Sequence, residues 1–170
     1  MYIQKKIPLK DKKKIISLDF KNGMENKGNK YVLNFRKKCF ETFLNKKNEF
    51  ESKNYKFYYE ENKASVKKIW DLYSKIQFVV SPNGNGVDCH RTYEALVLGA
   101  IVIIEKNNTE WQGYEALSNL YGKQIMIVEN YNNLTPEYLD QYIVEYQNSI
   151  KYNQEKLYCD YWINLIKNNL

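Results

Sequence analysis

The 170-residue sequence has few cysteines, glycines and prolines and no long apolar run, and each shortage excludes a class of protein. Its cysteines are odd in number and far apart (Cys39, Cys89 and Cys159), so we expect reduced thiols and neither a disulfide framework nor a Zn knuckle. Seven Gly and three Pro exclude collagen-like and Gly/Pro-rich low-complexity chains. No apolar run approaches the roughly 20 residues that a membrane helix needs. The N-terminal residues lack the apolar segment of a signal peptide, so we expect a cytoplasmic protein with no membrane partner.

Arginine and histidine are scarce as well, because 24 of the 26 basic residues are lysine and His90 is the only histidine. Residues 1–70 hold 19 Lys and Arg against 8 Asp and Glu, whereas residues 71–170 hold 7 against 12. A basic half could attract phosphates, nucleic acid or an acidic partner. Lysine, asparagine, isoleucine and tyrosine are equally typical of A/T-rich coding, which is the explanation we favour for the charge.

Hydrophobic residues make up 44% of the chain and aromatic residues 15%, which is enough for the core of one ordinary domain. Short β-rich runs alternate with helical patterns. The predicted strands are residues 14–20, 55–59, 76–81, 100–104 and 124–128, and the predicted helices are residues 31–45, 64–74, 89–98, 111–120, a helix from Pro136 and a last one near 157–166. This order predicts a doubly wound, mainly parallel α/β sheet of about five strands, Rossmann-like, with helices on both faces. Residues 1–13 and 21–30 are predicted to be flexible, and the last helix is expected to bury its aromatic side chains.

The turn after the third predicted strand looks built for a ligand, since ligands of such sheets bind beyond the carboxyl ends of the strands. It reads SPNGNGVDCHRTYEAL from Ser81. Gly84 and Gly86 would allow backbone N–H groups to approach an anion, and the helix that follows adds unpaired N–H donors. Arg91 supplies a planar fork that suits phosphate oxygens. Glu94 can share a helix face with Arg91, where its carboxylate could accept hydrogen bonds from ribose hydroxyls.

Each of these residues has a plainer alternative. The NGNG run is a turn signal, Asp88 is a candidate N-cap, Cys89 is expected to be a small buried residue, and Arg91 and Glu94 could form a surface ion pair. The sequence has no GxxxxGK[ST] motif, no third glycine of a dinucleotide fingerprint and no D-x-D pair. We therefore expect no P-loop, no bound metal and no cofactor.

The block SPNGNGVDCHRTYEALVLGAIVII resembles the signature of exostosin-like glycosyltransferases, in the nucleotide-sugar-binding C-terminal half of a GT-B fold. The resemblance implies that the Gly84–Gly86 loop and Arg91 face a diphosphate, His90 a phosphate or the donor sugar, and Glu94 the ribose. The implied donor-binding residues are Asn83, Gly84, Asn85, Gly86, Asp88, His90 and Arg91. The sequence departs from the pattern at Gly86, where relatives have an earlier glutamate, and at Val102, where they often have proline.

The resemblance implies a single nucleotide-sugar-binding domain over residues 1–170 that transfers a sugar from a UDP- or GDP-linked donor to a hydroxyl. A partner chain or a homodimer would supply the acceptor side, because the sequence has room for only one half of a GT-B enzyme. One alternative is a non-catalytic remnant that binds a nucleotide or another protein. A nucleic-acid binder ranks last, because the basic half has no Arg-rich base-reading pattern.

Overall fold

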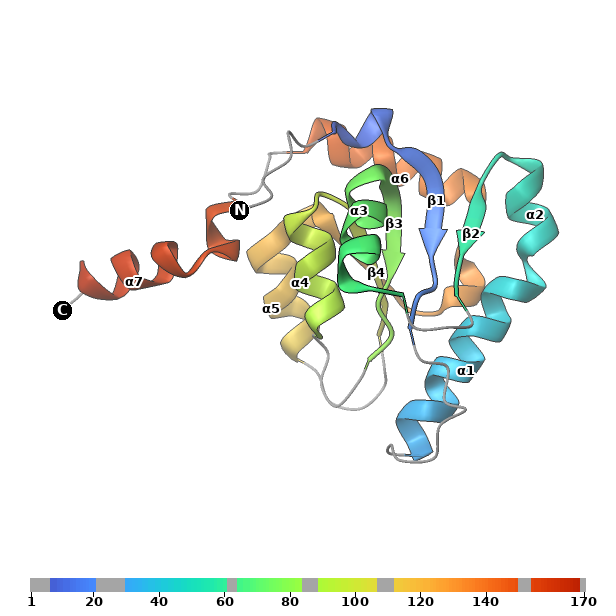
Figure 1. Cartoon of the computed structure of the whole chain (residues 1–170), viewed down its shortest axis with the longest axis horizontal. Helices are drawn as coiled ribbons and strands as arrows, with labels where there is room; N and C mark the ends of the chain where they lie inside the picture. The colour runs from blue at the N-terminus through green and yellow to red at the C-terminus, as the bar shows by residue number, and fades with distance from the viewer. Residues whose placement is uncertain are drawn as a thin grey trace.

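The computed structural model describes residues 7–20, 30–60, 64–83, 89–106, 112–149 and 154–168. Five strands form one sheet in the order β2-β1-β3-β4-β5, and every neighbouring pair is parallel (Figure 1). The strands are β1 (Lys13–Ser17), β2 (Lys56–Tyr58), β3 (Ile76–Val80), β4 (Ile101–Glu105) and β5 (Ile125–Val128). The predicted doubly wound α/β fold is confirmed.

The helices alternate with the strands, as predicted. They are α1 (Lys30–Asn45), α2 (Lys47–Ser52), α3 (Val66–Lys75), α4 (His90–Val97), α5 (Gln112–Tyr121), α6 (Pro136–Asn148) and α7 (Cys159–Lys167). Ser65 and Thr135 cap α3 and α6 by accepting hydrogen bonds from backbone N–H groups three residues on. The short α2 was not predicted. The N-cap position of α4 is Cys89, which corrects the prediction that Asp88 would hold it.

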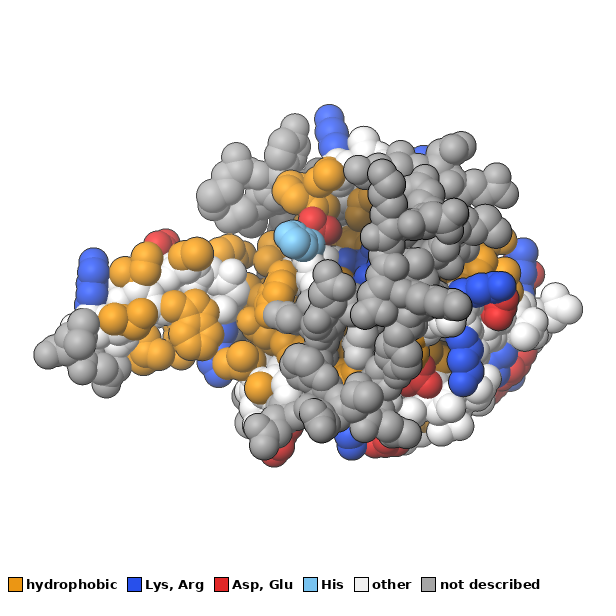
Figure 2. Space-filling view, turned by 90° about the horizontal axis from the view of Figure 1, so that it is seen from below, with side chains coloured by type: hydrophobic (Ala, Val, Ile, Leu, Met, Phe, Trp, Pro, Cys, Tyr) orange, Lys and Arg blue, Asp and Glu red, His pale blue; other side chains and the backbone are white. Residues whose placement is uncertain are grey.

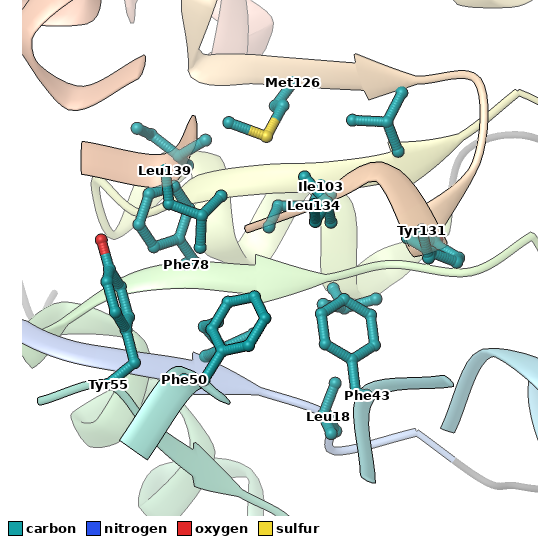
Figure 3. Packing of buried hydrophobic residues seen from close by; sticks show 14 of the residues in the cluster. Leu18, Phe43, Phe50, Tyr55, Phe78, Ile103, Met126, Tyr131, Leu134 and Leu139 are labelled. Atoms are coloured by element: carbon teal, nitrogen blue, oxygen red, sulfur yellow. The ribbon is translucent and has the colours of Figure 1, made fainter. Parts of the chain in front are cut away.

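Each face of the sheet carries its own hydrophobic core. On one face α1, α2 and α6 contribute Phe43, Phe50 and Leu139, which pack over β3 and β4 (Figure 3). On the other face α3, α4 and α5 contribute a second set, namely Ile69, Tyr73, Ala95, Leu96, Tyr114, Leu117 and Tyr121. Because both faces are covered, all five residues of β3 are buried, which explains why the strand is apolar except for Gln77.

Helix α7 lies apart from this layered body (Figure 1). None of its residues is buried, and its hydrophobic side chains form an exposed strip along it (Figure 2). The expectation that the last helix buries its aromatic residues is therefore wrong, since Tyr158 and Trp162 are both exposed. As for membrane spans, each helix in the described ranges is too short or too polar to cross a bilayer.

Candidate functional site

The candidate site lies at the carboxyl edge of the sheet, between β1 and β3. The chain passes from β1 to β2 on one side and returns to β3 on the other, so the strand order reverses at this point. Open α/β sheets bind ligands where such a reversal opens a crevice beyond the strand ends. Asp19 and Asn83, which follow these two strands, therefore lie where a ligand would be expected to bind.

Three side chains fix the end of β3 to the start of α4. The Ser81 hydroxyl lies 2.9 Å from the Thr92 hydroxyl and 3.2 Å from the Cys89 sulfur. Ser81 and Thr92 are fully buried, and the Ser81 N–H donates to the Ile103 carbonyl of β4. This network explains why the sequence has small hydroxyl residues on both sides of the turn. It fixes the direction in which the N-terminus of α4 points.

Arg91 lies in the first turn of α4 and reaches toward the end of β1. Its Nε donates a hydrogen bond of 2.9 Å to the Asp19 carbonyl oxygen, and its Nη1 lies 3.9 Å from the Cys89 sulfur. The guanidinium carbon lies 5.8 Å from the centre of the Phe20 ring. Arg91 is thus held in one direction by β1 while it stays partly exposed, as a residue that binds an incoming anion should be.

A second arginine reaches the same turn from α1. The Arg36 Nε donates to the Asn83 carbonyl oxygen over 3.2 Å. The Asn83 side-chain amide donates in turn to the Tyr114 hydroxyl of α5 over 2.5 Å. Asn83 therefore joins α1 to α5 at the end of β3, with its carbonyl and its Nδ2 both engaged by the protein.

The electrostatics of the site follow from partial burial near two positive charges. Burial lowers the pKa of Arg36, and the charge of Arg91 lowers it further. Burial raises the pKa of the Asp19 carboxyl, although the charge of Arg91 opposes this. Burial would also raise the pKa of the Cys89 thiol, but the hydrogen bond to Ser81, the charge of Arg91 and contacts with Thr92 together lower it below its ordinary value.

The structure brings together part of the predicted site. Arg91 and Glu94 are half-buried and one turn apart on α4, and His90 is exposed at its first position. Gly84, Asn85, Gly86 and Asp88 lie outside the described residues, so the glycine cradle stays a prediction. Within the residues that the structure does describe, no cluster of His, Cys, Asp or Glu is suited to hold a metal ion.

Sequence reasoning missed Arg36, because it lies far from the turn in a helix that reads as an ordinary amphipathic one. The composition of the chain nevertheless pointed to Arg36. Arg36 is the only arginine besides Arg91 in a chain with 24 lysines.

Comparison with protein-family models matches residues 25–132 to the RXYLT1 C-terminal domain, a xylosyltransferase family of the exostosin-like type. The match covers more than half of the 170 residues and includes Arg36 and the segment from Asn83 to Glu94. The resemblance to exostosin-like glycosyltransferases is therefore confirmed at the level of the family. No curated protein matches the chain.

Proposed function

The chain belongs to the family of the RXYLT1 C-terminal domain, and from this premise we propose that it is the donor-binding domain of a glycosyltransferase. Its substrate would be a nucleotide-diphosphate sugar, UDP- or GDP-linked. The observation that carries the proposal is Arg91, which stands in the first turn of α4 at the strand reversal and is oriented by the Asp19 carbonyl.

The diphosphate would lie at the N-terminus of α4. The first N–H groups of a helix have no partner within the helix, and the Cys89 side chain does not cap them. The aligned peptide dipoles give this end a partial positive charge that favours an anion. Arg91 adds a full charge and forked donors at the same place. Glu94, one turn farther along α4, would accept hydrogen bonds from the ribose hydroxyls.

In the proposed reaction, the oxygen of an acceptor hydroxyl attacks the anomeric carbon of the donor sugar. The bond from that carbon to the diphosphate oxygen breaks, and the diphosphate leaves with the electron pair. Negative charge develops on the leaving oxygen, where Arg91 and the α4 N-terminus would stabilise it. The acceptor proton passes to a general base on the acceptor side of the site.

Nucleotide binding by the full chain tests the proposal. At about 100 times the dissociation constant, UDP or GDP would raise the melting temperature by roughly 5–10 °C. Arg91→Gln should remove this rise. Lys106→Gln is a matched control, because Lys106 is exposed, follows β4 at the same sheet edge and pairs only with Glu129 among the contacts described. A folded wild-type chain that binds neither nucleotide in calorimetry would contradict the proposal.

The exposed apolar strip of α7 favours a second candidate, a non-catalytic domain that binds another protein. The measurement that separates the two is turnover. Release of UDP from a UDP-linked sugar in the presence of hydroxyl acceptors favours the transferase, and nucleotide-linked xylose is the first donor to try because of the family's name. Nucleotide binding without release favours the second candidate.

A further inference from the structure

The two arginines of the chain meet at the carboxyl edge of the sheet, although they come from different helices on opposite faces. The Arg36 Nε is bound to the carbonyl of Asn83, which follows β3, and the Arg91 Nε to the carbonyl of Asp19, which follows β1. Since β1 and β3 are neighbours in the sheet, both guanidinium groups are anchored beside the same strand reversal.

Aromatic contacts connect the two arginines along a second path. Phe20 lies under the Arg91 guanidinium at 5.8 Å and meets Phe40 edge-on, with ring centres 6.4 Å apart. Phe40 lies one helical turn after Arg36 on α1. The position of α1 relative to Arg91 is thus fixed by packing, and Arg36 is not a freely moving surface side chain.

Neither arginine forms an ion pair with a carboxylate within 4.0 Å among the described residues, and the nearest acidic influence described for Arg91 is the half-buried Asp19 carboxyl, whose pKa the charge of Arg91 lowers against the effect of burial. Within the described residues, all the ion pairs shorter than 4.0 Å are made by lysines. Arg36 and Arg91 are both partly buried, and the presence of Arg91 disfavours the charged form of Arg36. Holding two like charges together costs free energy in the empty protein, and an anion with two negative groups would offset that cost.

We propose that Arg36 is a second anion-binding residue of this site and that Arg36 and Arg91 together hold the two phosphate groups of a nucleoside diphosphate. The proposal rests on the function proposed above and adds Arg36 to the site and a preference for pyrophosphate over phosphate. Because its Nε is bound to Asn83, Arg36 offers its two terminal nitrogens to the ligand as a fork. Two forks match two phosphate groups, so the site should prefer pyrophosphate to single phosphate.

Calorimetry with inorganic pyrophosphate and with inorganic phosphate tests this, on the full chain. Arg36→Gln and Arg91→Gln should each weaken pyrophosphate binding by roughly 10- to 100-fold, the range for hydrogen bonds to charged groups. Arg36→Gln should also reduce the preference for pyrophosphate over phosphate, which a purely structural role would leave unchanged. Lys37→Gln is the matched control: it removes one charge from the neighbouring, exposed position of α1 and should change binding less than about twofold.

The outcomes separate the two proposals. If Arg91→Gln loses pyrophosphate while folded Arg36→Gln binds like wild type, the role of Arg36 is wrong and the donor-binding function stands. If wild type binds neither pyrophosphate nor UDP and GDP, both proposals are wrong. Should Arg36→Gln fail to fold, Arg36→Lys replaces it, because it keeps the charge but lacks the planar fork. Wild-type pyrophosphate affinity in folded Arg36→Lys would overturn the proposal.

Discussion

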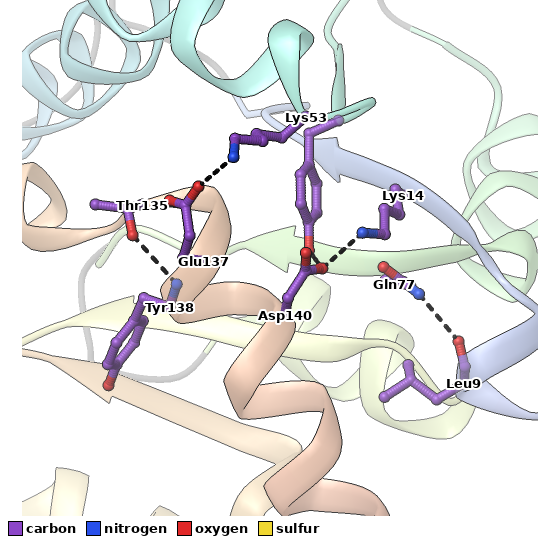
Figure 4. A network of polar contacts seen from close by, with 9 residues as sticks. Leu9, Lys14, Lys53, Gln77, Thr135, Glu137, Tyr138 and Asp140 are labelled. Carbon is purple, nitrogen blue, oxygen red and sulfur yellow. Dashed lines mark hydrogen bonds and ion pairs between the residues drawn. The ribbon is translucent and has the colours of Figure 1, made fainter.

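The basic side chains at the two edges of the sheet differ in the partners that they bind. At the amino edge, the buried ammonium of Lys12 donates to the carbonyls of Tyr73 and Leu98, where α3 and α4 end. Lys14 pairs with Asp140 over 2.7 Å (Figure 4). The Tyr55 hydroxyl donates to the same carboxylate. At the carboxyl edge, the hydrogen bonds described for Arg36 and Arg91 go to the carbonyls of Asn83 and Asp19, to the Cys89 sulfur and to the Tyr73 side chain.

This difference suggests that the basic residues of the amino edge serve the stability of the fold and those of the carboxyl edge serve ligand binding. The cation at the amino edge satisfies carbonyl groups that the ends of helices would leave unpaired, so removing it should cost stability. The cations at the carboxyl edge are positioned by hydrogen bonds from their Nε atoms and form no ion pair within 4.0 Å among the described residues, so removing them should cost ligand binding more than stability. Variants at the two edges can break or sharpen this comparison.

The largest effect is expected at Lys12. Replacing it by methionine keeps most of the volume but leaves the carbonyls of Tyr73 and Leu98 without this donor. The free energy of unfolding should fall by about 2–3 kcal/mol, as measured by urea denaturation. Lys10→Met, at an exposed position of the preceding turn, should change it by less than about 0.5 kcal/mol. Equal losses in the two variants would remove the special role of Lys12.

The fold was largely predictable from the sequence, because the five apolar runs are short and the helical patterns between them are clear. The error at α7 has a physical reason. An amphipathic pattern shows that a helix has an apolar face but not what covers it, and for α7 the described part of the chain supplies no cover. The missed α2 has only one buried residue, Phe50, so it shows too little periodicity to be found.

A smaller loss is expected from Tyr55→Phe. The ring of Tyr55 is fully buried, and its hydroxyl donates to Asp140 over 2.7 Å. Removing the hydroxyl should lower the free energy of unfolding by about 1 kcal/mol, the usual net value of one hydrogen bond. Tyr138→Phe removes a hydroxyl from an exposed ring and should cost less. A Tyr55→Phe variant as stable as wild type would show that the contacts of the amino edge contribute little.

The candidate site was less predictable than the fold. Local spacing was enough to place Arg91 and Glu94 together on the helix that follows the turn, while their binding roles stay predictions. Arg36 is brought to the turn by the tertiary packing of α1, including Phe40 against Phe20 and Phe43 against Tyr131, contacts between segments that no local pattern connects. Composition gave the one usable signal, since only two of the 26 basic residues are arginine and their planar forks differ from lysine in what they can bind.

At the carboxyl edge, Arg91→Gln should lower stability far less than Lys12→Met does. It loses the hydrogen bond to the Asp19 carbonyl and the weaker contacts with the Cys89 sulfur and the Tyr73 side chain, but it relieves the repulsion with Arg36, so the net change should stay within about 1 kcal/mol. Pyrophosphate binding should weaken by roughly 10- to 100-fold in the same protein. A loss of stability as large as that of Lys12→Met would mean that both edges serve the fold, and the comparison between them would fail.

The finest test is the reactivity of Cys89, which reports on Arg91 without changing it. Because the thiol pKa is lowered, iodoacetamide should react with Cys89 at a pH below that of an ordinary thiol. The measurement uses Cys159→Ser to remove the exposed thiol, while Cys39 is buried and its pKa is raised by burial, so it should react slowly. Bound pyrophosphate would neutralise Arg91 and cover the turn, which should shift the pH profile upward and slow the reaction. A profile that pyrophosphate leaves unchanged, at a concentration that calorimetry shows to be saturating, would place the anion elsewhere than beside Arg91.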